Sequence, residues 1–178
     1  MSDHLRRVSV VTSASGTGGT TFARSLADRL GVPFHKLDAL FWRPDWMETP
    51  ADEFRALVEP IVATDAWVID GSYQSKLGDH MFRRADLVVW LDLPFGVWLP
   101  RLIGRTLARV VRREELWAGN RESLRNVFLS RDSLLLFTLR HYRGRRRRYP
   151  VRLGRFSLVR LRTKEEVERF LLRAGNAE

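Results

Sequence analysis

Residues 13–21, Ser-Ala-Ser-Gly-Thr-Gly-Gly-Thr-Thr, combine glycines with small hydroxyl side chains, as a phosphate-binding loop does. They follow a strand-like run at 8–11 and precede a helix-like run at 22–30. Against the pattern G-x-x-x-x-G-K-[ST], Ser13 takes the first glycine position, Gly18 keeps the second and Gly19 replaces the lysine. The spacing therefore predicts a degenerate Walker A loop that binds a nucleotide without the usual cation.

The glycines at 16 and 18 let the backbone wrap around an anion with its N–H groups inward, and the following helix adds a partial positive charge. The Thr20 hydroxyl is placed to bind Mg²⁺. We expect ATP or another nucleotide and Mg²⁺ as cofactors. The alternative is that this cluster is only a strand-to-helix loop. The residues expected to bind the cofactor are Ser13, Gly16, Thr17, Gly18, Gly19, Thr20 and Thr21.

The missing lysine bears on activity, because in a complete loop it reaches the β and γ phosphates and neutralises charge that develops between them. Three interpretations follow. The protein binds nucleotide without turning it over, another cation such as Lys76 or a lid arginine replaces the lost charge, or nucleotide binding is lost as well.

The composition indicates one globular domain over residues 1–178, with 44% hydrophobic residues and a net charge of +10. The absence of cysteine excludes disulfides and zinc–thiolate sites. No signal peptide or apolar run long enough to cross a membrane is present, so we expect a cytoplasmic protein with no membrane partner. Arginines outnumber lysines 28 to three, which favours an anionic partner, either a nucleotide or a nucleic acid.

Short apolar strands alternate with helical segments, which predicts an α/β fold with a mostly parallel sheet and helices on both faces. The expected strands are 8–12, 34–37, 67–70, 87–91 and 156–161, and the expected helices are 20–30, 50–63, 95–113, 121–142 and 163–174.

Acidic residues follow or end three of these strands, where open α/β sheets bind their ligands. Asp38 could orient an acceptor hydroxyl, accept its proton or hold Mg²⁺ through water; otherwise it is a turn or helix cap. Asp92 could reach Mg²⁺ through water or could simply end its strand before Pro94. Trp42 and Trp46, in a polar loop, are candidates for a pocket wall.

Two basic segments need a separate explanation. Arg101, Arg105, Arg109 and Arg112 share one helical face, where like charges repel unless an anion binds there. Residues 143–148 carry five arginines around one glycine. Such a run is either a solvated, flexible segment or a nucleic-acid-binding patch. The alternative function is therefore a non-catalytic protein associated with nucleic acid.

Ordered blocks along nearly the whole chain resemble small bacterial P-loop proteins of the adenylate-kinase-like, or DNA topology-modulation, type. In the block at 67–73, Asp-Gly-Ser-Tyr stands where that family usually has Asp-Gly-Asn-Tyr. The blocks are the loop itself and residues 23–33, 37–42, 44–46, 67–73, 84–86, 90–94, 115–123 and 159–162.

The resemblance implies a three-layer P-loop fold with strand order 2-3-1-4-5, and an arginine-rich lid at 114–122 within a basic region of about 101–148. It also implies transfer of the γ-phosphoryl group of ATP to a small hydroxyl or phosphate acceptor, weak or lost here because of Gly19. The residues implied on the acceptor side are Asp38, Trp42, Asp70, Gly71 and Tyr73, although Asp70-Gly71 also fits an ordinary turn. The lid arginines implied to act in catalysis with Asp38 are Arg105, Arg109, Arg113 and Arg121.

Overall fold

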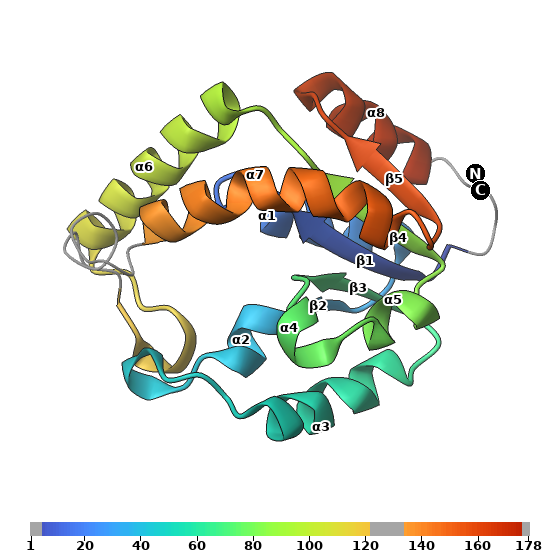
Figure 1. Ribbon diagram of the computed structural model, residues 1–178, viewed down its shortest axis with the longest axis horizontal. Helices are drawn as coiled ribbons and strands as arrows, with labels where there is room; N and C mark the ends of the chain where they lie inside the picture. The colour runs from blue at the N-terminus through green and yellow to red at the C-terminus, as the bar shows by residue number, and fades with distance from the viewer. Residues whose placement is uncertain (1–4, 122–133, 176–178) are drawn as a thin grey trace.

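The computed structural model describes residues 5–121 and 134–175. Its strands form one five-stranded parallel sheet of order β2-β3-β1-β4-β5, which confirms the expected topology (Figure 1). Crossover helices keep neighbouring strands parallel, so all the carboxyl ends meet at one edge. The strands are β1 (Arg7–Thr12), β2 (Phe34–Lys36), β3 (Trp67–Asp70), β4 (Leu87–Leu91) and β5 (Leu158–Leu161).

Helices cover both faces of this sheet. One core lies under α1 and α8, and a second lies under α3, α4, α5 and the end of α7. The helical elements are α1 (Gly19–Leu30), α2 (Leu37–Phe41), η1 (Pro44–Trp46), α3 (Ala51–Val62), α4 (Gln74–Leu77), α5 (His80–Arg84), α6 (Phe95–Arg112), η2 (Trp117–Gly119), α7 (Leu134–Leu153) and α8 (Lys164–Gly175).

The central strands are apolar because both of their faces are covered. Val8 and Val10 of β1 pack under α1, whereas Val11 faces the opposite core. Trp67 and Trp90 are fully buried in that second core, so these two tryptophans support the fold and do not line a pocket.

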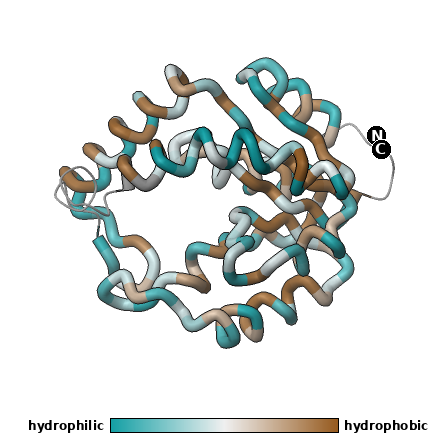
Figure 2. Tube along the Cα trace, viewed as in Figure 1, coloured by the Kyte–Doolittle hydropathy of each residue, from teal (hydrophilic) through white to brown (hydrophobic). Residues whose placement is uncertain are grey.

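The basic run at 143–148 differs from the expected flexible segment, because it lies inside α7. Figure 2 shows this helix as mostly hydrophilic along its middle. Arginine is a good helix former, and Tyr142, Tyr149 and Leu153 are buried along one stripe of the helix. That stripe holds the charged turns in place. The expected helix at 121–142 was wrong in its end point, and residues 122–133 lie outside the described part.

None of the helices in the described part of the chain is long and apolar enough to cross a membrane.

Candidate phosphate-binding site

The loop between β1 and α1 has the backbone that an anion requires. Gly16 and Gly18 have φ of 88° and 85°, in the left-handed region where glycine is favoured. Gly18 is the N-cap of α1 and supplies no side-chain cap, so the first N–H groups of this 12-residue helix have no side-chain cap partner. The N-terminus of α1 and the glycine loop together are therefore a candidate anion site.

Position 19 is packed as a glycine site. A Cβ atom there would lie 2.6 Å from Cγ2 of Thr12 and 3.4 Å from Oδ1 of Asp70. The first distance is shorter than Cβ atoms tolerate, so a lysine at this position needs Thr12 to move. Position 19 therefore lacks both a lysine and the space in which its side chain would begin.

Thr20 and Asp70 meet directly beside this position. The Thr20 hydroxyl donates a hydrogen bond of 2.6 Å to Oδ2 of Asp70, which is 8% exposed. Burial raises the pKa of Asp70, whereas the hydrogen bond from Thr20 lowers it. The charge of Asp38 raises this pKa further. A hydroxyl beside a desolvated carboxylate is a donor set that fits Mg²⁺.

The Thr20–Asp70 pair would need further ligands to hold Mg²⁺. In residues 5–121 and 134–175, no group of three or more His, Cys, Asp or Glu side chains could hold a metal ion by itself. Mg²⁺ commonly uses one or two protein oxygens together with phosphate oxygens and water. Thr20 and Asp70 would therefore hold the ion only together with a bound nucleotide.

Asp38 and Tyr73 form the neighbouring, acceptor-side pair. The Tyr73 hydroxyl donates a 2.5 Å hydrogen bond to Oδ1 of Asp38, which lies in the first turn of α2 and is one-third exposed. Burial and the Asp38 charge strongly raise the pKa of Tyr73, so its phenol stays a neutral donor. Tyr73 has φ of 37°, an uncommon backbone conformation that structures retain mainly at functional sites.

Lys36 was missed by the sequence reasoning, although it lies in this cluster. It is the register partner of Asp70 across β2 and β3, and it lowers the pKa of Asp70. Its Nζ lies 3.7 Å from Oδ2 of Asp38 and 4.6 Å from the ring centroid of Trp117. Lys76, one of the candidates for a replacement cation, pairs with Glu48 at 2.8 Å. The expected strand order already made β2 and β3 neighbours, so matching the carboxyl ends of these two strands would have pointed to Lys36.

The described part of the expected lid closes onto the loop after α2. Asn120 is buried; it accepts a hydrogen bond from the Trp46 backbone N–H at 3.0 Å and donates one to the Arg43 carbonyl at 2.8 Å. The rings of Trp46 and Trp117 lie 6.5 Å apart, which brings η1 and η2 together in Figure 1. Trp42 packs against Trp46 at 5.6 Å. These tryptophans join residues 114–121 to the loop after α2, whereas base stacking by them stays a prediction.

The expected lid arginines have local partners. Arg109 lies 3.6 Å from Glu114, and Arg121 pairs with Glu115. Arg113 ends α6 in a left-handed conformation. A role toward phosphate for these three residues and for Arg105 stays a prediction.

Asp92 has a structural setting that neither sequence interpretation included. It is fully buried, accepts a 2.6 Å hydrogen bond from Ser13 and is paired with both Arg146 and Arg160. Trp90 donates to the same Ser13 hydroxyl at 2.8 Å. Ser13, the first residue of the loop, therefore ties the loop to β4, β5 and α7. A metal contact by Asp92 would compete with two guanidinium groups, so Asp70 is the better candidate.

Comparison with known proteins gives similarity in structure but not in sequence. No protein-family model matches the chain, and the search of curated proteins finds no significant match. A gluconokinase from Sinorhizobium meliloti 1021 aligns with a TM-score of 0.57 and 18% identity, over 98% of this chain and 91% of that one.

Two further solved structures align over similar lengths. A sugar kinase from Janibacter sp. HTCC2649 has a TM-score of 0.50 and 20% identity, over 95% of this chain and 92% of that one. A shikimate kinase from Bacteroides thetaiotaomicron has a TM-score of 0.50 and 16% identity, over 93% of this chain and 94% of that one. At these identities the likeness establishes the fold alone. The chain has the P-loop α/β fold of these small-molecule kinases.

Proposed function

We propose that this protein binds ATP·Mg²⁺ at residues 13–21, and that phosphoryl transfer to a small hydroxyl or phosphate acceptor is weak or lost because Gly19 replaces the lysine. The observation that carries the proposal is the Thr20–Asp70 pair beside the glycine loop. The kinase fold of the structural neighbours supports it. The proposal also includes the narrower assignment, based on the sequence blocks, to the small bacterial P-loop proteins of the DNA topology-modulation type.

Each group has a defined task in this proposal. The loop N–H groups and the N-terminus of α1 bind the phosphates, and Thr20 with Asp70 holds the metal ion. The ion, when bound, would withdraw charge from the phosphate oxygens. Asp38 accepts the proton of an acceptor hydroxyl while the acceptor oxygen bonds to the γ-phosphorus and the bridging bond to ADP breaks.

Lys36 accounts for nucleotide binding without the usual lysine. Within the described residues its ammonium has no hydrogen bond of 3.5 Å or less, and its Asp38 contact is 3.7 Å. Its N–H groups are therefore available to an anion near Asp70. A lysine that starts from β2 approaches from another direction than one at position 19, so it would assist binding more than transition-state stabilisation.

Calorimetric titration with ATP tests the proposal, with Mg²⁺ and with EDTA. We expect binding that Mg²⁺ strengthens, and Thr20→Val should lose that Mg²⁺-dependent gain. Thr64→Val, which changes an exposed threonine at the end of α3, is the matched control and should bind as the parent does. No heat and no thermal shift at millimolar ATP·Mg²⁺ would refute nucleotide binding.

A further inference from the structure

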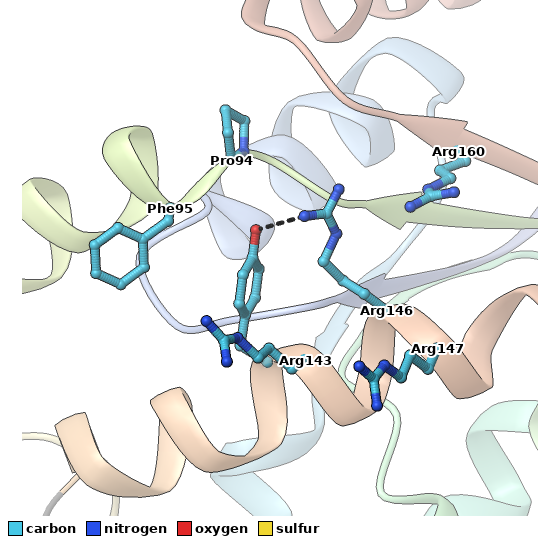
Figure 3. A pocket seen from close by; sticks show the side chains of 7 residues that line it. Pro94, Phe95, Arg143, Arg146, Arg147 and Arg160 are labelled. Carbon is cyan, nitrogen blue, oxygen red and sulfur yellow. Dashed lines mark hydrogen bonds between the residues drawn. The ribbon is translucent and has the colours of Figure 1, made fainter.

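A pocket of about 600 Å³ lies between the start of α6, the middle of α7 and β5 (Figure 3). Its lining contains no residue of the loop at 13–21 and neither Asp38 nor Asp70. We propose that this pocket binds a small phosphorylated anion. The lining residues are Pro94, Phe95, Tyr142, Arg143, Arg146, Arg147 and Arg160.

The charge of the lining is the first argument. Four arginines face the pocket, and Asp92 pairs with two of them, Arg146 and Arg160. For Arg143 and Arg147, the described part of the chain contains no hydrogen bond or ion pair. Positive charge therefore exceeds negative charge in the pocket, and a bound anion would neutralise the excess.

The helix geometry strengthens this argument. Arg143, Arg146 and Arg147 are spaced i, i+3 and i+4 on α7, so they share one face, where like charges destabilise a helix. Planar guanidinium groups match the oxygens of phosphate with paired hydrogen bonds. Figure 3 shows Arg143, Arg146 and Arg147 on α7, with Arg160 reaching in from β5.

Part of the pocket is already organised without a ligand. Arg146 donates to the Tyr142 hydroxyl at 3.1 Å and to Asp92 at 3.1 Å. Arg160 donates to Asp92 at 3.0 Å and stacks over the Trp90 ring at 4.1 Å. Two of the four guanidinium groups are thus held in place, which lowers the ordering cost of binding.

The size and the rim favour a small ligand over a nucleic acid. A volume of about 600 Å³ is in the range of small-molecule sites. The Phe95 ring is 45% exposed at the edge and gives an apolar surface beside the charges. Arg145, from the same run, turns away and donates to the Ser13 carbonyl at 3.4 Å. The run therefore divides between the pocket, which Arg143, Arg146 and Arg147 line, and the loop, which Arg145 contacts.

Titration with pyrophosphate in EDTA tests the site. We expect Arg143→Gln/Arg147→Gln to weaken pyrophosphate binding at least tenfold while ATP·Mg²⁺ binding stays within about twofold of the parent. Arg29→Gln/Arg173→Gln, two exposed arginines on α1 and α8, removes the same charge elsewhere and should leave both affinities unchanged. All four positions are exposed, and a thermal melt verifies that each variant is folded.

Three results would overturn the proposal. Equal pyrophosphate binding by the two double variants, or an equal loss in both, would mean that the pocket arginines do not form the site. The third is that a single-stranded oligonucleotide binds through Arg143 and Arg147 while pyrophosphate does not bind. Because the lining of the pocket includes no residue of the loop at 13–21, failure of ATP·Mg²⁺ binding in the parent leaves this test intact.

Discussion

Restoring the lysine at position 19 is the sharpest test of the active-site reasoning, provided that the space is restored too. A Cβ atom at 19 would lie 2.6 Å from Cγ2 of Thr12, so Gly19→Lys alone is expected to strain the end of β1. Thr12→Ser removes that methyl group and keeps the hydroxyl. Gly19 has no positive φ, so its backbone accepts a side chain. The variant to build is therefore Thr12→Ser/Gly19→Lys.

The expected magnitudes separate charge from packing. Overpacking of this kind costs about 1–3 kcal/mol, so Gly19→Ala and Gly19→Lys should each lower the free energy of unfolding by that amount. A donor aimed at developing charge is worth about 2.7–4 kcal/mol, or roughly a 100- to 1000-fold change in kcat. Thr12→Ser/Gly19→Lys should recover the stability and raise turnover by that factor, whereas Gly19→Ala should not raise it.

The assay measures ADP release from ATP·Mg²⁺, together with urea unfolding and calorimetric ATP affinity for each variant. Thr12→Ser alone is the control for the cleared methyl group. If the double variant binds ATP as tightly as the parent and still releases no more ADP, the lysine is not the missing element. If the parent already turns over at the rate of the double variant, another cation has taken its place.

Three further changes test the surrounding cluster. Lys36→Gln should weaken ATP·Mg²⁺ binding about tenfold by calorimetry, because it removes a charged phosphate contact, whereas Lys76→Gln, already paired with Glu48, should not. If both variants bind as the parent does, Lys36 has no such contact. Asp70→Asn should abolish the Mg²⁺-dependent part of ATP binding yet stabilise the fold at pH 7. Its folded pKa is raised above 3.8, so its protonated form stabilises the fold at low pH, and that stability is lost as pH rises through the folded pKa. Urea unfolding at pH 7 and below pH 4 measures the difference, which should shrink in acid; a less stable variant at pH 7 would contradict this. Asp92→Asn should cost about 1.5–3 kcal/mol in the same unfolding assay, since two partly exposed arginines lose their charged hydrogen-bond partner. A cost below about 1 kcal/mol would mean that the ion pairs are not coupled to folding.

The sequence by itself determined the sheet, through apolar runs bounded by turn residues and through the ordered blocks of the resemblance. It also located the glycine loop and the acidic strand ends, because these features are local: a strand, a turn and a helix start can be recognised within about twenty residues. The same local reasoning placed the end of the α7 helix wrongly. The arginine-rich turns of α7 are held in place by the buried side chains of Tyr142, Tyr149 and Leu153. This burial can be recognised only in the folded protein.

Tertiary structure alone decided which of the expected side chains touch, and it added Lys36 to the site. Lys36 faces Asp70 across β2 and β3, Ser13 reaches Asp92 across 79 residues, and Asn120 joins the segment at 114–121 to Trp46 across 74 residues. Local patterns carry no record of such pairs, since each depends on strand order and on packing between distant segments. The chemistry of position 19 divides in the same way. The sequence shows that no lysine charge is present at position 19. Only the folded structure shows that the Thr12 methyl group fills the space for a side chain there.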